Sequence, residues 1–392
     1  MREQILENFL KTFGTEGGEP RIFFSPGRVN LIGEHIDYNG GLVLPCALSL
    51  GTYGAIRKRD DNAIKLFSGN FETFAEFSID ELIHDPAHKW GNYPKGVVAT
   101  LKEAGYTVSG LEMYIFGNLP SGAGLSSSAS LNTLVATALS AVFELGISPI
   151  KIAQLCQTAE KFNDVNCGIM DPFACTMGKK DHAILLNCDN LEYEHIPLNL
   201  GDYRILIANT NHRRGLADSK YNERRGECEA ALADLQKVCD IKELCELSPE
   251  QFEMYKTAIA AEIPRKRAEH AVMENGRTKD AAQLLKKGEL QQLWNLMVAS
   301  HVSLDELYDV VGDALGAMFE ASYEYANLHK DAWGVIGTRM TGAGFGGCTV
   351  SIVHKDYIDD FIKNVGDKYY ARTGVKASFY VAETSDGTGE IF

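Results

Sequence analysis

The sequence lacks the features that mark a membrane or secreted protein. No apolar run approaches the ~18 consecutive residues that a membrane-spanning helix needs. The first 14 residues mix apolar side chains with Glu3, Glu7 and Lys11, which is typical of an amphipathic helix rather than a signal peptide. The nine cysteines include no Cys-x-x-Cys pair and no His/Cys cluster, which argues against a disulfide framework and a structural zinc site. We therefore expect a cytoplasmic protein with reduced thiols.

Positive charge is also scarce. Lys and Arg number 38 against 53 Asp and Glu, for a formal net charge of −15, and the basic residues form no block or stripe. A nucleic-acid partner would favour such a stripe, so neither nucleic acid nor a membrane is expected as a partner. An acidic protein can still bind an anionic ligand through helix N-termini, backbone amides, a metal ion and a few placed cations. The expected partners are small molecules, and the oligomeric state stays open, a monomer included.

Apolar material is plentiful enough for a full core. Hydrophobic residues make up 45% of the 392 residues, a length that suggests two domains. Apolar alternation and short apolar runs predict strands at residues 21–25, 42–56, 62–79, 111–116, 183–188, 203–208, 348–353 and 377–382. Helical spacing predicts helices at residues 93–104, 129–145, 149–162, 220–247 and 265–327, the last with breaks near Gly276 and Gly288. The predicted class is α+β, with domains at 1–200 and 201–392.

A Gly/Ser loop at residues 119–129 lies between a predicted strand and a predicted helix. Its glycines let the backbone approach an anion closely, and the free amides of the helix start point toward that anion. Ser126, Ser127 and Ser128 offer hydroxyls for phosphate oxygens or for Mg²⁺. The pattern favours a phosphate cradle, although it lacks the P-loop lysine. A flexible turn with a serine N-cap is the alternative.

Another loop, at residues 25–41 and therefore the first along the chain, concentrates chemical groups between glycines. Arg28, Glu34, His35 and Asp37 fall within ten residues. Carboxylates and imidazole can bind vicinal sugar hydroxyls, and a guanidinium can stabilise charge on a transferring phosphoryl group. The alternatives are a surface turn with ion pairs and a metal site built from the two carboxylates and the histidine, although no further histidines are available to complete one.

Two further segments need their context to be interpreted. Residues 338–348 contain a formal G-x-G-x-x-G at Gly342, Gly344 and Gly347, but a strand-like run follows it where a dinucleotide fold requires a helix. In Cys167–Phe173, Asp171 followed by Pro172 predicts an N-cap with proline at the first helical position, which is an ordinary structural role for an aspartate.

In this order and spacing, the three loops resemble the kinase superfamily that includes galactokinase, homoserine kinase, mevalonate kinase and phosphomevalonate kinase. PGRVNLIGEHIDYNGG, at residues 26–41, is similar to the signature of the galactokinase family. Further matches fall at KWGNYPKG, CGIMD, YNERRGEC and RMTGAGFGGC, so the resemblance spans nearly the whole chain. It implies the GHMP kinase fold: an N-terminal domain like ribosomal protein S5, with a left-handed crossover, and a ferredoxin-like C-terminal domain, with the active site between them.

The resemblance also implies a reaction, transfer of the γ-phosphoryl group of MgATP to the C1 hydroxyl of galactose in galactose catabolism. It assigns Asp171 to the sugar hydroxyl that attacks and Arg28 to transition-state charge. The remaining roles it implies are galactose ligands at Glu34, His35, Ile36, Asp37, Gly168 and Tyr221, a triphosphate cradle at Gly122, Ala123, Gly124, Leu125, Ser126, Ser127 and Ser128, Mg²⁺ ligands at Ser128 and Glu160, and an adenine contact at Trp90.

The chain departs from the family pattern in two places. Pro172 stands where most galactokinases have glutamine. Segment 160–167 is one residue shorter than usual, which leaves Asp164 as an alternative to Glu160. Two alternative functions follow, a sugar-1-kinase for N-acetylgalactosamine or arabinose, and a sugar sensor without catalysis. A sensor should have lost a chemical group, whereas Arg28, Asp171 and the serines are all present.

Overall fold

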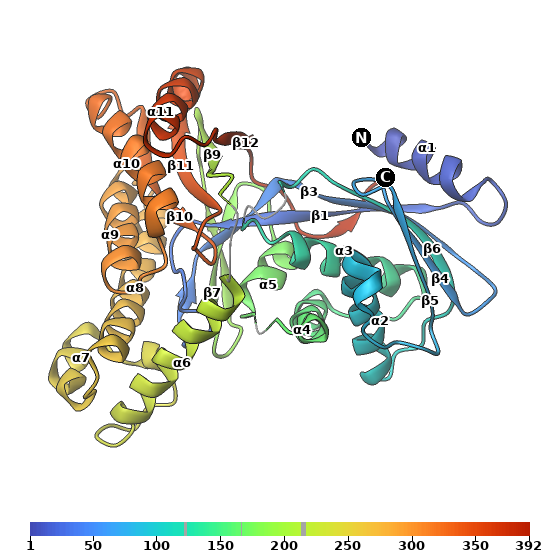
Figure 1. Ribbon diagram of the computed structural model, residues 1–392, viewed down its shortest axis with the longest axis horizontal. Helices are drawn as coiled ribbons and strands as arrows, with labels where there is room; N and C mark the ends of the chain where they lie inside the picture. The colour runs from blue at the N-terminus through green and yellow to red at the C-terminus, as the bar shows by residue number, and fades with distance from the viewer. Residues whose placement is uncertain (121–123, 166, 213–216) are drawn as a thin grey trace.

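The computed structural model describes residues 1–120, 124–165, 167–212 and 217–392. Strands and helices are segregated as the α+β prediction requires, and Figure 1 shows two sheets that meet near the middle of the molecule. The two chain ends lie close together at one side of the first sheet (Figure 1).

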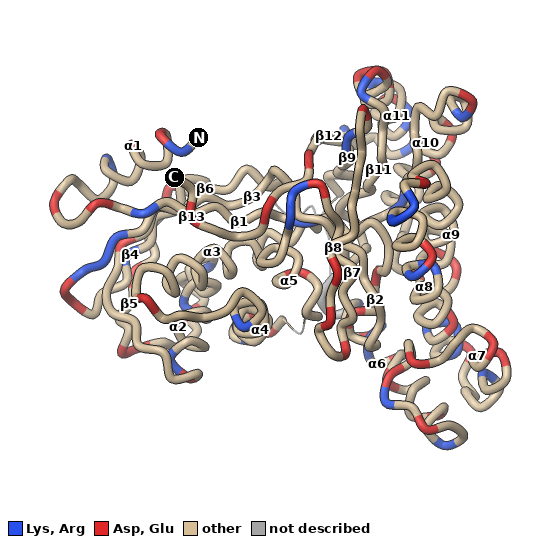
Figure 2. The backbone as a smooth tube through the Cα atoms, turned by 180° about the vertical axis from the view of Figure 1, so that it is seen from behind, with Lys and Arg blue, Asp and Glu red and all other residues tan. Residues whose placement is uncertain are grey.

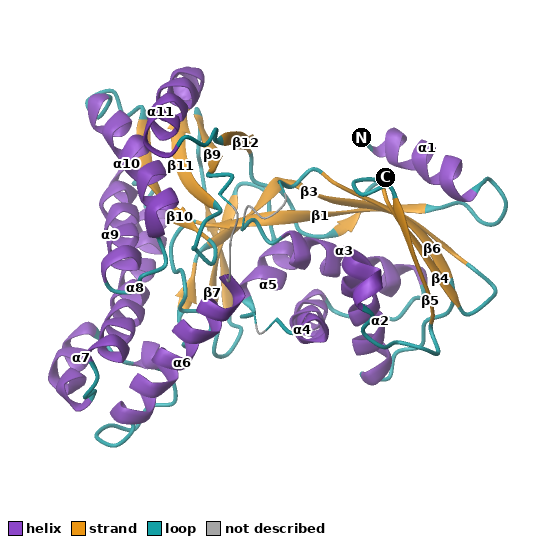
Figure 3. Ribbon diagram, viewed as in Figure 1, coloured by secondary structure: helices purple, strands orange, loops and turns teal. Residues whose placement is uncertain are grey.

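The first sheet has six strands in the order β13-β1-β3-β6-β4-β5. Their bounds are Gly389–Glu390, Arg21–Asn30, Pro45–Lys58, Leu111–Gly117, Ala63–Ser68 and Thr73–Ser78. All neighbours are antiparallel except β4 and β6, which run parallel. Helix α1 (Arg2–Phe13) packs on one face of this sheet. Helices α2 (Asn92–Glu103), α3 (Ser127–Val142), α4 (Pro149–Glu160) and α5 (Met170–Met177) gather on the other (Figure 3).

Helix α3 is central to the packing of this half. Apolar residues at helical spacing, among them Leu134, Val135 and Leu139, bury it against β1 and β3. Its N-terminus opens from the Gly/Ser loop, so the packing that fixes the helix also fixes that loop.

The second half is built on a four-stranded antiparallel sheet in the order β10-β11-β9-β12. These strands span Val335–Thr341, Cys348–His354, Tyr203–Asn209 and Ser378–Ala382. Helices α9 (Leu293–Glu306) and α10 (Gly312–Leu328) pack on β10, and α11 (Ile358–Thr373) packs on α10. This half also contains three further helices, α6 (Ala217–Leu235), α7 (Pro249–Tyr255) and α8 (Glu262–Lys286). A third sheet joins β2 (Leu42–Val43), β7 (His182–Asn187) and β8 (Tyr193–Pro197).

Three local predictions were wrong. Helix α8 continues through Gly276, where a helix break was expected, because its neighbours Asn275 and Thr278 are buried by tertiary packing. The helix predicted at 220–247 ends at Leu235, and only a 3₁₀ turn at Leu244–Glu246 follows. Residues 338–341 belong to a strand, β10, rather than to a loop.

The predicted division at residue 200 stays a prediction, and contacts of several kinds cross it, among them a strand pairing and an apolar cluster. Strand β13, at the end of the chain, pairs with β1 through Phe23 and Phe24. One apolar cluster joins Val29 and Leu44 of the first half to Ile207 and Val350 of the second.

Two further features of the described part of the chain are the distribution of its charged residues and the apolarity of its helices. Lys and Arg are scattered over the elements rather than gathered on one of them (Figure 2). Among the residues described, no helix combines the length and apolarity that crossing a membrane requires.

Candidate active site

The geometry of β1 places Arg28 in the interior of the site. The pairing of β1 with β3 shifts register between Pro26 and Arg28, and such a bulge redirects the side chain that follows it. Gly27 is required there, because a Cβ at this position would lie 2.7 Å from the carbonyl oxygen of Leu125. Arg28 is only 4% exposed, and its Nη1 donates to the carbonyl oxygen of Gly124 at 2.7 Å.

Arg28 also forms an ion pair with Asp171. Its Nε donates to Asp171 Oδ1 at 2.8 Å, and its Nη2 lies 2.6 Å from the same oxygen. Burial would lower the pKa of Arg28, but the charges of Asp171 and Glu34 more than offset it, so the guanidinium stays charged. The Asp171 side chain is 28% exposed, so it keeps access to a ligand.

The prediction that Asp171 caps α5 was wrong. Ile169 occupies the N-cap position without a side-chain hydrogen bond, and Asp171 is the second residue of the helix. The carboxylate turns to Arg28 rather than to the free amides of its own helix. Pro172 disrupts no helical hydrogen bond, because the first amides of a helix have no intrahelical acceptor.

The described part of the Gly/Ser loop has the properties of an anion site. Gly124 has φ 73° and Ser126 has φ 60°, both in the left-handed region. Ser126 is the N-cap of α3, and its Oγ is buried without a partner among the described residues. Leu125 anchors the loop in the core. Gly122 and Ala123 lie outside the described residues, so their predicted role stays a prediction.

Ser128 and Glu160 lie side by side, on α3 and at the end of α4. The Ser128 hydroxyl hydrogen-bonds to Glu160, and Asn132 donates to Glu160 Oε1 at 2.9 Å. Burial raises the pKa of Glu160 to about 7, with the charge of Asp171 as a further cause. Asp164, the alternative, is exposed and lies beyond the end of α4. The hydrogen bond to Ser128 therefore favours Glu160.

Asp37 faces the backbone of Gly168. A Cβ on Gly168 would overlap the Asp37 carboxylate, so only glycine allows this approach. Burial and then the charges of Asp171 and Glu34 raise the pKa of Asp37 to about 7. The ring of Tyr221, on α6, lies 5.6 Å from the His35 ring. The structure thus brings Asp37, Gly168 and Tyr221 close to Asp171.

Glu34 connects the first loop to the third. Its Oε1 accepts from the amide of Gly342 at 2.6 Å, its Oε2 accepts from Asn30 Nδ2 at 2.8 Å, and Arg339 Nη1 lies 3.5 Å away. Gly342 in turn lies against the phosphate loop, where a Cβ would be 2.8 Å from the carbonyl oxygen of Gly124. The third loop is the turn between β10 and β11, with a strand on both sides, so the rejection of a dinucleotide fold is confirmed.

His35 uses both ring nitrogens inside the protein. Its Nδ1 lies 2.8 Å from the Tyr38 hydroxyl and its Nε2 lies 3.1 Å from the carbonyl oxygen of Ala343. Burial, and then nearby His270, lower its pKa to about 3, so the ring is neutral. No group of three or more His, Cys, Asp or Glu is placed to hold a metal ion within the described ranges, so the alternative metal site of the first loop has no support.

Two predicted site residues have structural contacts of their own. The Ile36 side chain is fully buried in an apolar cluster with Val43 and Phe173. Trp90 lies in a 3₁₀ segment, donates to Thr73 at 3.1 Å and packs against the core around α2 and α3. Sequence reasoning missed Arg339 and Tyr308 as contacts of the loop at residues 25–41, here termed the sugar loop, and Tyr38 as the partner of His35 within it.

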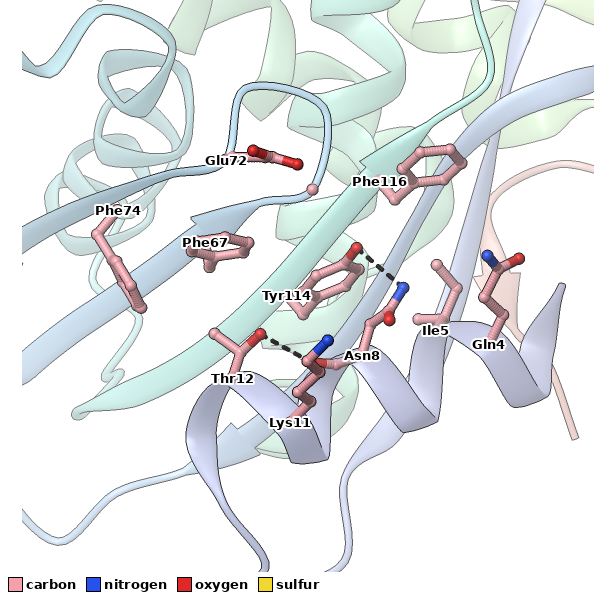
Figure 4. A pocket seen from close by; sticks show the side chains of 11 residues that line it. Gln4, Ile5, Asn8, Lys11, Thr12, Phe67, Glu72, Phe74, Tyr114 and Phe116 are labelled. Carbon is pink, nitrogen blue, oxygen red and sulfur yellow. Dashed lines mark hydrogen bonds between the residues drawn. The ribbon is translucent and has the colours of Figure 1, made fainter.

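A pocket of about 580 Å³ lies elsewhere, between α1 and the outer face of the first sheet. Figure 4 shows Asn8, Lys11 and Thr12 of α1 on one side of it and Phe67 and Tyr114 on the other. The sheet separates this pocket from α3 and α5, so it is not part of the site around Asp171.

Comparison with known proteins assigns the family. Residues 7–58 match the galactokinase galactose-binding signature, residues 92–179 the GHMP kinases N terminal domain and residues 281–371 the GHMP kinases C terminal domain. The galactokinase of Fusobacterium nucleatum is 51% identical, with 99% of this chain and 100% of that protein covered. That of Bacillus subtilis is 46% identical, with 100% and 99% covered.

Solved structures agree. The galactokinase of Lactococcus lactis, crystallised with galactose, has a TM-score of 0.94 and 43% identity, and the match covers 100% of both chains. The mevalonate kinase of Methanococcus jannaschii shares the fold, with a TM-score of 0.68 at 18% identity, covering 94% of this chain and 99% of that chain. With two loops that meet at the Gly124 carbonyl and full-length relatives at about half identity, the chain belongs to the galactokinase family of GHMP kinases.

Proposed function

We propose that this protein transfers the γ-phosphoryl group of ATP to the C1 hydroxyl of galactose, giving galactose 1-phosphate and ADP. The observation that carries the proposal is the Arg28–Asp171 pair. Through Arg28 it is joined to the Gly124 carbonyl of the phosphate loop, and through the helix α5 to Gly168 and Asp37 of the sugar side. Residues that assist the transfer of a phosphoryl group to a sugar have to lie between the bound nucleotide and the bound sugar, as we propose for this pair.

Phosphoryl transfer asks the protein mainly for alignment and for charge stabilisation. Arg28, held in a buried position, offsets the negative charge that develops between the attacking oxygen and the phosphorus. Asp171 accepts the hydrogen bond of the C1 hydroxyl and orients it. Carboxylates are much weaker bases than sugar alkoxides, so we propose that the proton moves late to Asp171 and that positioning is its larger contribution.

The sugar site is proposed to select galactose through paired acceptors. Asp37, beside the bare backbone of Gly168, binds two neighbouring hydroxyls, and Tyr221 and Glu34 contact the rest of the ring. His35 contributes by placement, since both of its nitrogens are engaged. The contribution of Ile36 is confined to its backbone, because its side chain is in the core. Trp90 is proposed to contact adenine.

Ser128 and Glu160 are proposed to hold Mg²⁺. The fit rests on an observation: a buried carboxylate whose pKa is raised to about 7 hydrogen-bonds to a hydroxyl at the start of α3, beside the phosphate loop. A divalent cation satisfies both oxygens, and Mg²⁺ prefers one or two protein oxygens together with phosphate oxygens. When bound, it would offset the charge of the triphosphate.

The test is an assay of ADP release by the purified protein with MgATP and galactose, glucose, N-acetylgalactosamine or arabinose, with the phosphate position determined by NMR. We expect galactose to turn over best and to carry phosphate on C1. Preference for another sugar would move the protein to a sister sugar-1-kinase function. Binding of galactose and ATP without turnover of any sugar would contradict the proposal and favour a sensor.

A further inference from the structure

A chain of hydrogen bonds passes through the sugar loop and has both of its ends in the C-terminal half. It begins at the carbonyl oxygen of Ala343, passes through His35 to the Tyr38 hydroxyl, and continues to the Tyr308 hydroxyl at 2.8 Å from Tyr38. The Tyr308 hydroxyl then meets Cys228 Sγ at 3.1 Å. The residues come from the first loop, from the turn after α9 and from α6, so contacts far apart in sequence fix one histidine ring.

The Ala343 end of this hydrogen-bond chain determines which group donates in each of its hydrogen bonds. The Ala343 carbonyl can only accept, so His35 Nε2 carries the hydrogen. His35 is neutral, with a pKa lowered to about 3 by burial and by His270, so its Nδ1 is an acceptor and Tyr38 donates to it. Tyr38 then accepts from Tyr308, and Tyr308 accepts from the Cys228 thiol.

The ring of Tyr308 also packs against residues that hold the sugar loop in place. It lies between two imidazoles, with centroids 4.9 Å from His35 and 4.6 Å from His270. His270 Nε2 lies 3.1 Å from the carbonyl oxygen of Glu34, and its Nδ1 lies 2.8 Å from Ser303 Oγ. Tyr308 therefore contacts the groups that hold two successive residues of the loop, Glu34 and His35. It is completely buried and does not face the ligand space itself.

Tyr221 packs its ring against the two hydrogen-bonded rings of His35 and Tyr38. Its ring lies 5.6 Å from His35 and 5.4 Å from Tyr38, so the position of both rings determines where Tyr221 stands beside the sugar. We propose that Tyr308 is a positioning residue of the sugar site, which acts through Tyr38 and His35 on galactose binding and leaves the ATP side unaffected. This inference rests on the proposed function.

The test compares Tyr308→Phe, Tyr38→Phe and the double variant in steady-state kinetics. Phenylalanine keeps the ring and removes only the hydroxyl, so Tyr38 or His35 loses a buried partner. For each single variant we expect KM for galactose to rise about 5- to 30-fold, since an unmet buried hydrogen bond costs about 1–2 kcal/mol. KM for ATP should stay within about 2-fold of wild type, because neither of the hydroxyls removed contacts the described part of the phosphate loop.

The double variant tests the order of the chain. Tyr38→Phe already removes both bonds of the Tyr38 hydroxyl, so adding Tyr308→Phe should raise KM for galactose no further. Tyr325→Phe is the matched control, because Tyr325 is 2% exposed and its hydroxyl binds Asp360 at 2.8 Å, in the core around α11. It should leave both KM values unchanged.

Three outcomes would overturn the inference in an enzyme whose wild type phosphorylates galactose. They are an unchanged galactose KM in folded Tyr308→Phe and Tyr38→Phe, an equal rise in both KM values, and additive effects in the double variant. If wild type itself does not turn galactose over, the proposed function fails first, and the two failures are thereby distinguished.

Discussion

Asp37 and Glu160 are carboxyl groups whose surroundings raise their pKa into the neutral pH range. Burial is the largest cause for both, the charge of Asp171 adds to it, and each pKa is raised to about 7. Each carboxyl group is therefore protonated over part of the neutral pH range when no ligand is bound. We propose that hydrogen bonds from two sugar hydroxyls stabilise the ionised form of Asp37, and that Mg²⁺ stabilises the ionised form of Glu160.

The stability of the ligand-free protein should fall as pH rises. A carboxyl whose folded pKa is raised contributes stability below its ordinary pKa, and that contribution is lost as pH rises through the folded pKa of about 7. Thermal melts of wild type should therefore decline between pH 5 and pH 8. Asp37→Asn, which cannot ionise, should decline less and bind galactose more weakly in calorimetry. Parallel melting curves for the two proteins would contradict the assignment of this pH dependence to Asp37.

Asp171 should be necessary for turnover and dispensable for nucleotide binding. Asp171→Asn keeps the shape and one oxygen near Arg28 but loses the charge that pairs with it. We expect kcat to fall by about 10²-fold or more, in the range of a lost general base, while ATP binding stays measurable by calorimetry. Asp164→Asn is a suitable control, since Asp164 is exposed at the end of its helix. Near wild-type turnover in Asp171→Asn would remove it from the reaction.

The turn between β10 and β11 is the element that links the two proposed ligand sites. Its Gly342 amide donates to Glu34, its Ala343 carbonyl accepts from His35, and a Cβ added to its Gly342 would meet the Gly124 carbonyl of the phosphate loop. A displacement of the turn would therefore change the sugar loop and the phosphate loop together.

Gly342→Ala tests this link against a matched glycine. Gly342 has φ 84°, and its added Cβ would press on the Gly124 carbonyl, whereas Gly374 has φ 72° with nothing within 4 Å. Both alanines should cost about 1–2 kcal/mol of stability from backbone strain. Gly342→Ala alone should also raise the KM values of both substrates and lower kcat. Equal kinetics in the two variants would show that close packing of the turn on Gly124 has no role.

The sequence predicted most elements but not their partners. Helices with strong apolar spacing, such as α3 and α4, began and ended within a few residues of the predicted bounds. Strand β10 was missed because it is buried on both faces yet contains Thr338, Arg339 and Thr341, which do not alternate as apolar and polar residues. Asp171 was misplaced because the N-cap preference is local, whereas its carboxylate is held by Arg28, 143 residues away.

The candidate site was predictable only as far as its motifs reach. The first two loops and CGIMD marked Arg28, Asp37 and Asp171, and the resemblance supplied their roles. Nothing in the neighbourhood of Tyr308 in the sequence marks it, because its contact with Tyr38 spans 270 residues. Such contacts follow from tertiary packing and are visible only in three dimensions.

At the scale of the whole molecule, residues 388–390 contact the two elements that carry the Arg28–Asp171 ion pair. Strand β13 pairs with β1, and the Glu390 carboxylate forms an ion pair with Arg21 at 2.6 Å. The Thr388 hydroxyl binds both Ser25 on β1 and the Cys175 carbonyl on α5, each within 2.9 Å. These two elements carry Arg28 and Asp171.

Removal of residues 385–392 should therefore lower both stability and activity. The truncation strips an edge strand from the first sheet and several hydrogen bonds from β1 and α5. We expect Tm to fall by more than about 5 °C and kcat to drop, with calorimetry and the ADP-release assay as readouts. Removal of Phe392 alone, which is 95% exposed, is the control and should change neither. A truncated enzyme with wild-type Tm would show that the tail adds nothing to the sheet.

The position of this tail has a consequence for biosynthesis. The ribosome releases the N-terminal half early, and N-terminal segments generally begin to fold first. The partner that closes the edge of β1 is β13, which follows all the other described helices and strands in chain order. The nascent chain can thus build helices α2–α5 on an incomplete sheet, and the contacts of β13 with β1 can form only after the second half of the molecule has been synthesised.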